Sequence, residues 1–229
     1  MYIKHTKNMV IFNKDENNLE ALGQMEIINE IKQAEKQNRP ADFSNKILSD
    51  FNVIIDKAMF GLNLENVKIM GPVFLGEVIV MGDINFKGAV VNGSLYLGKS
   101  DIKQNLILEG AQINGAINLV GSKIGGSVNA RGLITVGFLS LAKTEILGDV
   151  ILEDAEIESA NYDELMVRGD AFFGASNVKG NLNLGKMRTE GTIDLEETNI
   201  GSNLVLTGTQ SNKGSIDTTK VKIGGKKII

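Results

Sequence analysis

An eleven-residue repeat predicts that this chain of 229 residues is an all-β protein, a right-handed quadrilateral parallel β-helix (solenoid) with eleven-residue half-coil repeats and an N-terminal α-helical cap. Two observations support the prediction. Glycine recurs in one place of successive repeats, and each repeat holds two pairs of apolar residues spaced two apart. A spacing of two puts both members of a pair on the same face of a short strand.

The repeat is clearest from residue 92, where successive units are NGSLYLGKSDI, KQNLILEGAQI and NGAINLVGSKI. Their common form is x-G-x-φ-x-φ-x-x-A/S-x-I, with φ an apolar residue, and the register extends from residue 59 to the final partial unit GGKKII. One extra residue, Asn212, precedes the last full unit. The glycines in the second place are Gly71, Gly82, Gly93, Gly115, Gly126, Gly137, Gly148, Gly169, Gly180, Gly191, Gly214 and Gly225.

The spacing of the apolar pairs dictates a coil. The pairs begin at the fourth and ninth places, so strands recur every five or six residues, with only two or three residues left for each turn. A helical crossover needs a longer connection, whereas a chain that turns the same way at each corner closes a coil of four strands and 22 residues. Roughly eight such coils, stacked at about 4.8 Å, form a rod about 35–40 Å long. Parallel crossovers favour the right hand.

The stack of coils is expected to bury the core, because one coil cannot enclose it alone. Small Ala or Ser at the ninth place leaves room for the larger residue opposite. Glycine at the second place is expected at a corner where φ is positive or where backbones crowd. The predicted inward set contains Leu95, Leu97, Ile102, Leu106, Leu108, Ala111, Ile113, Ile117, Leu119 and Ile124.

The A-x-I and φ-x-φ pairs, clearest in GAQIN, GSKIG and EDAEI, resemble the A-(D/N)-L-x-x units of pentapeptide-repeat proteins over about residues 59–225. The sixth residue of alternate turns and the glycine beside it depart from that pattern. A weaker resemblance is to bactofilins, polymer-forming bacterial β-helices that lack this strict unit. The first resemblance implies end-to-end dimerisation. It also implies DNA mimicry, since pentapeptide-repeat inhibitors of DNA gyrase are negatively charged rods.

The N-terminal part is expected to differ from the rest, with a polar tail and amphipathic capping helix over 1–47 and the β-helix domain over 48–229. Segment 41–58 is expected to form an imperfect first coil. A helix is predicted over 15–36, with Asp15 as its N-cap and residues 38–40 as its stop. We expect it to cover the open edge of the first coil, with partner binding as the alternative. Its apolar stripe contains Leu19, Leu22, Met25, Ile28, Ile31 and Ala34.

The stretch 158–167 shifts the register by one residue and lacks the glycine. It indicates either a bulge or short turn, or a place where the rod presents a site. Around it, acidic residues follow one another with no Lys or Arg between them, which is typical of a solvated face or of a patch for a basic protein partner or a cation. This acidic patch contains Glu145, Asp149, Glu153, Asp154, Glu156, Glu158, Asp163 and Glu164.

The C-terminal coil is basic and has one acid, Asp217, among five lysines, which are Lys213, Lys220, Lys222, Lys226 and Lys227. An uncovered coil is a template for pairing with another chain. The sequence therefore predicts a homo-oligomer, a dimer or a polymer, formed through the end that carries Lys220, Lys222, Lys226 and Lys227. The same lysines are also open to the opposite interpretation, as protection of the edge against pairing.

Composition excludes several classes of function. The net charge of −4 argues against binding nucleic acid phosphates. The absence of cysteine excludes disulfides, thiolate metal sites and thiol nucleophiles. No apolar run approaches the ~20 residues of a membrane-spanning helix, and the first residues lack the apolar segment of a secretory signal. We therefore expect a cytoplasmic protein with no transmembrane segment.

Catalytic motifs are absent or contradicted by their context. Residues 93–100 match the phosphate-loop pattern GxxxxGK[ST], but the repeat puts them on strands, whereas a phosphate loop opens a helix. The single histidine, His5, lies in the polar tail. Glu153 and Asp154 are adjacent, so a strand would point them to opposite faces. The sequence predicts no enzyme, no catalytic residues, no cofactor and no metal site.

Three functions follow as hypotheses. The first is a non-enzymatic scaffold, a rigid rod that binds an unknown protein partner or associates with itself. The second is a DNA-mimicking inhibitor of a DNA-binding enzyme such as gyrase, although lysines interrupt the acidic faces. The third is a small ligand binder or enzyme at the interruption in 158–167.

Overall fold

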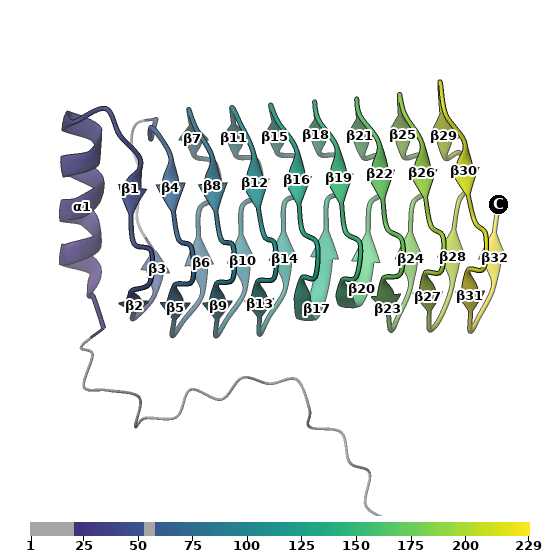
Figure 1. Cartoon of the computed structure of the whole chain (residues 1–229), viewed down its shortest axis with the longest axis horizontal. Coiled ribbons are helices and arrows are strands. Elements are labelled where there is room, and N and C mark those ends of the chain that lie inside the picture. The colour runs from purple at the N-terminus through teal and green to yellow at the C-terminus, as the bar shows by residue number, and fades with distance from the viewer. Residues whose placement is uncertain (1–20, 53–57) are drawn as a thin grey trace, which may run out of the picture.

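The computed structural model describes residues 21–52 and 58–229. Over these residues the chain is a parallel β-solenoid of about 8 turns, with one helix at its N-terminal end (Figure 1). The predicted fold class is therefore confirmed. The first coil begins at Ala41, which pairs with Leu62 of the next coil, so the solenoid starts before residue 48, the expected domain boundary.

Each coil adds short strands to four faces, numbered in chain order. Face 1 contains β1 (Ala41–Asp42), β4 (Leu62–Asn63), β8 (Ile84–Asn85), β12 (Leu106–Ile107), β16 (Val128–Asn129), β19 (Val150–Ile151), β22 (Ala171–Phe172), β26 (Ile193–Asp194) and β30 (Ile216–Asp217). Face 2 contains β2 (Ile47–Leu48), β5 (Lys68–Ile69), β9 (Val90–Val91), β13 (Gln112–Ile113), β23 (Asn177–Val178), β27 (Asn199–Ile200) and β31 (Lys222–Ile223). Face 3 contains β3 (Phe51–Asn52), β6 (Val73–Phe74), β10 (Leu95–Tyr96), β14 (Ile117–Asn118), β24 (Leu182–Asn183), β28 (Leu204–Val205) and β32 (Lys227–Ile228). Face 4 contains β7 (Ile79–Val80), β11 (Asp101–Ile102), β15 (Lys123–Ile124), β18 (Glu145–Ile146), β21 (Met166–Val167), β25 (Arg188–Thr189) and β29 (Gln210–Ser211).

Two longer strands, β17 (Ile134–Ser140) and β20 (Glu156–Asn161), run around the corner between faces 2 and 3 and join them in one sheet. The interruption of the repeat lies at this corner. Thr135 pairs with Ile157 and Phe138 with Ser159, so a single residue, Glu158, stands opposite two on β17. After this corner the offset between coils returns to 22 residues, since Ala160 is paired with Leu182. The first coil is also one residue short, because Ala41 is paired with Leu62.

The predicted core is confirmed. All ten residues of the predicted inward set are at most 1% exposed. The expected coil of 22 residues is seen in the pairing of Leu95 with Ile117, two positions that differ by 22 in number. Apolar side chains therefore stack on the corresponding side chains of the next coil, and the core is continuous along the rod.

The second-place glycines are required by crowding and not by a positive φ. A Cβ on Gly115 would lie 2.6 Å from the carbonyl carbon of Gly93, one coil earlier. The positive φ angles fall instead at the eighth place, where Gly110 has a φ of 63° and Lys99 a φ of 58°. Of the two alternatives that the sequence left open, crowding is confirmed, because the second place is where the backbones of adjacent coils come close.

The helix α1 (Gln24–Lys36) lies across the first coil at one end of the rod (Figure 1) and packs against β1 and β3. It ends where it was predicted to end but starts later than expected. Leu22 is extended and pairs with Leu48, and the N–H of Gly23 donates to the Glu26 carboxylate at 3.0 Å. Asp15 and Leu19 lie outside the described residues.

The apolar stripe of α1 is rotated from the predicted one. Ile27 and Ala34 are buried, and Ile31 packs against the same core. Met25, which was expected to face the coil, is 67% exposed. These three core-facing residues keep the spacing of one helical face, and the expected function of the helix as a cover for the first coil is consistent with this packing.

Tyr162 is fully buried and its hydroxyl has no hydrogen-bond partner among the described residues. Its ring stacks on Phe173 at 5.5 Å, and burial raises the pKa of the phenol above its ordinary value. Because an unpartnered buried hydroxyl destabilises the fold, we expect Tyr162→Phe to raise the free energy of unfolding by about 1–2 kcal/mol. Urea titration measures this change. Tyr96→Phe, at an exposed tyrosine, should change little, and a loss of stability in Tyr162→Phe would mean that the hydroxyl is satisfied.

Candidate functional site

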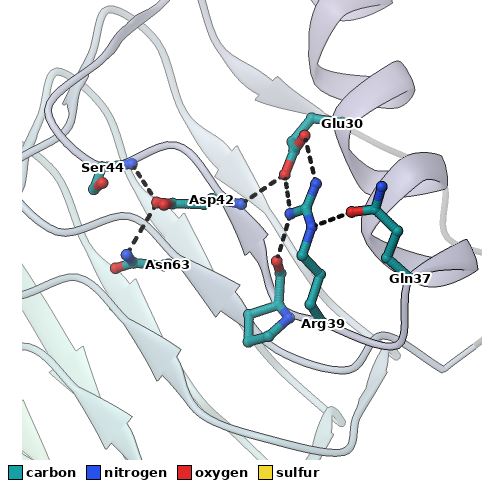
Figure 2. Close-up of polar contacts among 7 residues, drawn as sticks. Glu30, Gln37, Arg39, Asp42, Ser44 and Asn63 are labelled. Carbon is teal, nitrogen blue, oxygen red and sulfur yellow. Dashed lines mark hydrogen bonds and ion pairs between the residues drawn. The ribbon is translucent and has the colours of Figure 1, made fainter.

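A closed polar network fixes the helix to the first coil (Figure 2). Arg39 donates to the Glu30 carboxylate at 2.6 and 3.3 Å, and Glu30 also accepts the N–H of Asp42 at 3.1 Å. Asp42 in turn accepts the N–H of Ser44 and the amide of Asn63, each at 3.0 Å. The hydrogen bond from Arg39 lowers the pKa of Glu30, and the Ser44 N–H lowers that of Asp42. Both carboxylates are therefore ionised at neutral pH.

An open groove of about 890 Å³ runs beside this network along face 1. Its lining includes Arg39, Phe60, Asn63, Asp83 and Asn85. Arg39 also donates to the side chain of Gln37 and the carbonyl of Pro40 (Figure 2), so its guanidinium is engaged within the chain. The network therefore acts as a clamp that holds α1 on the rod.

Polar side chains at the third place of the repeat form a ladder along the corner between faces 4 and 1. From Asp83 to Asp170 each accepts the backbone N–H one coil later, as Asp83 does from Asn105 at 2.8 Å and Asp149 from Asp170 at 2.8 Å. Sequence reasoning missed this ladder. The signal was visible, since alternate repeats carry Asp, Asn, Ser or Thr in that place, as in Asp83, Asn105, Ser127, Asp149, Asp170, Thr192 and Ser215.

The structure does not bring the acidic patch together on one surface. Glu145 lies on face 4 and Glu156 on face 2, and Glu158 forms the corner between faces 2 and 3. The eight carboxylates therefore surround the rod. The five remaining members fall in turns or in the corner ladder, and they are Asp149, Glu153, Asp154, Asp163 and Glu164.

Neighbouring coils supply the cations that the linear sequence lacks around these acids. Arg131 pairs with Glu153, Lys179 lies 3.5 Å from Glu158, and Lys186 lies 3.0 Å from Glu164. The hydrogen bond from Lys186 lowers the pKa of Glu164. Stacking places residues about 22 apart in sequence side by side, so an unbroken acidic run along the chain is not an acidic surface.

A shallow depression lies on face 4, at the end of the stretch 158–167 and not at the corner where the register shifts. Met166 and Val167 line it together with Glu145, Arg168 and Arg188, and its volume is about 160 Å³. Ligand pockets typically measure about 300–1,000 Å³. The geometry therefore gives little support to a ligand site at this place.

Residues 93–100 are ordinary coil, as the repeat predicts. Leu95 and Leu97 are buried, and Lys99 pairs with Glu77 of the preceding coil at 3.1 Å. The strand β11 follows, so no helix N-terminus meets the loop. The phosphate-loop pattern has no structural counterpart here.

The two ends of the rod differ. Ile216, Val221 and Ile223 of the last coil continue the core but are only partly buried. One coil earlier, Ile193 and Ile200 are at most 2% exposed. The described residues thus cover the first coil with α1 and leave the apolar interior of the last coil accessible.

The lysines of this end fall into two groups. Lys220 pairs with Glu196 at 3.2 Å and Glu197 at 2.8 Å, so it is engaged with the preceding coil. No described acid forms an ion pair with the others, which are Lys222, Lys226 and Lys227. Lys227 pairs with Leu204 in register, so it stands at the place that a core leucine fills one coil earlier on face 3, but on the last coil its side chain is exposed.

Exposed aromatic residues form a feature that the sequence pattern did not single out. Phe74 and Tyr96 stack on face 3 with ring centroids 4.9 Å apart. In the next coil the same position is Asn118, whose side chain accepts the N–H of Val120 and closes its turn. The stacked rings replace the side-chain hydrogen bond that Asn118 makes in its own coil, and such a cross-strand aromatic pair stabilises the step between two coils.

Comparison with models of known protein families, with curated proteins and with solved structures finds no match. The similarity to pentapeptide-repeat proteins therefore remains a similarity of pattern, while the β-solenoid itself is established by the structure. In the part of the chain that the structure describes, no helix is long and apolar enough to cross a membrane. The same residues contain no group of three or more His, Asp or Glu side chains arranged to hold a metal ion.

Proposed function

We propose that the chain is a non-enzymatic structural or interaction scaffold, a rigid β-solenoid rod that pairs with a second copy through its C-terminal coil. One observation carries the proposal. The apolar interior is covered by Ile27 and Ala34 of α1 at one end, whereas Ile216, Val221 and Ile223 are accessible at the other. Partly exposed core residues in a continuous patch are a common mark of an association surface.

The capped end favours a closed dimer over a filament. A head-to-tail polymer needs two different open ends, because each contact joins unlike surfaces. Here α1 occupies the N-terminal end (Figure 1), and the Arg39–Glu30 pair fixes it there. Two copies that meet through the same C-terminal coil form an isologous contact, which closes after one step.

The use of polar side chains supports a scaffold. The corner ladder, the closed turns and the buried hydroxyls all bond to the backbone, as Ser122 does to the carbonyl of Leu97 at 2.7 Å. These groups hold coil to coil and are not free for chemistry. The result is a rod whose rigidity comes from repeated local contacts.

The contacts between coils do not favour DNA mimicry. Lys87 lies 3.1 Å from Glu109 and Lys99 lies 3.1 Å from Glu77, each across one coil step. Such pairs alternate charge along the rod, whereas a DNA mimic requires a continuous row of negative charges. The scaffold remains the function that we propose.

Light scattering of the full chain in phosphate buffer tests self-association. We expect the mass of a dimer for the wild-type protein and of a monomer for Ile223→Asp, which puts a charge in the accessible interior of the last coil. Ile79→Asp, at a 46% exposed position far from that end, is the control and should remain dimeric. Circular dichroism checks that both variants keep the fold. A wild-type monomer, or a mass that keeps growing with concentration, would contradict the closed dimer.

A further inference from the structure

The core columns of the last coil end differently on different faces. Ile216 stacks on Ile193 of face 1, and Ile223 stacks on Ile200 of face 2, so both columns stay apolar to the end. On face 3 the column of Leu182 and Leu204 ends in Lys227. A cation thus stands where a core leucine would otherwise complete the apolar end.

End-to-end pairing would bring these cations together. Each copy contributes Lys222, Lys226 and Lys227, for which the described residues provide no ion pair. Glu197 interacts electrostatically with Lys222 but is already paired with Lys220 at 2.8 Å. Asp217 accepts the N–H of Thr219 at 2.8 Å, and Thr219 lowers its pKa. Ammonium groups that lose water without gaining a counter-charge oppose association.

We infer that a multivalent inorganic anion of the phosphate type binds between the two C-terminal coils and permits them to pair, with Lys227 as the residue that imposes this requirement. The inference rests on the proposed function. An anion with several oxygens can accept hydrogen bonds from lysines of both copies at once, and it neutralises the charge that otherwise keeps the apolar ends apart.

The experiment measures the dimer dissociation constant by light scattering in sodium phosphate and in sodium chloride at equal ionic strength and neutral pH. For the wild-type protein we expect a constant about tenfold lower in phosphate. For Lys227→Leu, which extends the apolar column, we expect dimers in both salts with similar constants. Lys123→Leu, an exposed lysine on face 4 in the middle of the rod, should behave as wild type.

The outcomes separate the two proposals. Equal wild-type constants in both salts would overturn the anion requirement and leave the dimer intact. A phosphate effect of the same size in Lys227→Leu would also overturn it, because phosphate strengthens apolar association in general. If Lys227→Leu stays monomeric in both salts, the C-terminal coil is not an association surface and the proposed function fails. If Lys227→Leu forms dimers and the wild-type protein forms none in either salt, Lys227 prevents pairing in the natural chain, which contradicts both proposals.

Discussion

Replacing Gly115 with alanine is expected to lower the free energy of unfolding by about 3 kcal/mol, the upper part of the range for overpacking a close-packed interior. The new Cβ would stand 2.6 Å from the carbonyl carbon and 2.7 Å from the carbonyl oxygen of Gly93. Both atoms belong to the backbone of the preceding coil, so neither can move without disturbing the pairing of the whole stack. Urea or thermal unfolding measures the loss.

Gly110→Ala is the matched control. Gly110 has a φ of 63°, and a Cβ added to it would meet no heavy atom within 4 Å, so only conformational strain opposes the alanine. In the same column, Asn66 and Asp154 adopt similar φ angles of 53° and 58°. The expected loss is about 1 kcal/mol. If both variants lost the same free energy of unfolding, crowding between coils would not be the reason for glycine at the second place.

A charge in the buried face of the capping helix should also be costly. Ile27 is 0% exposed, and Ile27→Asp is expected to lower the free energy of unfolding by about 3 kcal/mol or more, because an unpaired carboxylate replaces a core side chain. The first coil depends on this cover, since Phe43 and Phe51 form an edge-to-face pair beneath it with centroids 5.6 Å apart. Binding of a dye for exposed apolar surface should rise with the loss of stability.

Met25→Asp provides the comparison within the same helix. Met25 is 67% exposed and lies in the first turn, where a negative charge interacts favourably with the helix dipole. We expect unchanged or slightly higher stability. A loss of stability as large as that of Ile27→Asp would show that the cap depends on helix formation and not on the buried contact of Ile27.

Much of the fold was predictable because equivalent positions in successive coils carry the same type of residue, so each position is predicted from several coils at once. Leu95, Leu97 and Ile102 are buried as expected, and each has equivalents in the other coils that carry the same signal. The start of α1 was not predictable from its pattern, because Leu22 fits the helical spacing but instead pairs with Leu48 of the first coil. A single local pattern cannot foresee a competing partner from a later segment.

The candidate sites were harder to predict, because they depend on which residues meet across coils. Glu153 and Glu164 follow one another in an acidic run, yet Arg131 and Lys186 from adjacent coils lie beside them. The sequence shows Lys227 only as one of several terminal lysines, and its alignment with the core residue Leu204 follows from the strand pairing. A residue-by-residue alignment of coils would have revealed both facts.

The central claim, that two copies meet at the C-terminal coil, is tested most directly by distances between spin labels in the dimer formed in phosphate. Because the chain has no cysteine, one introduced cysteine is a unique label site. Gln210→Cys in β29 should give an intermolecular distance below about 40 Å, since both labels lie within a few coil spacings of the contact. Lys32→Cys on α1 should give no dipolar signal, because two rods joined end to end separate their helices by about 80–100 Å. A clear short distance at Lys32→Cys and none at Gln210→Cys would contradict the account.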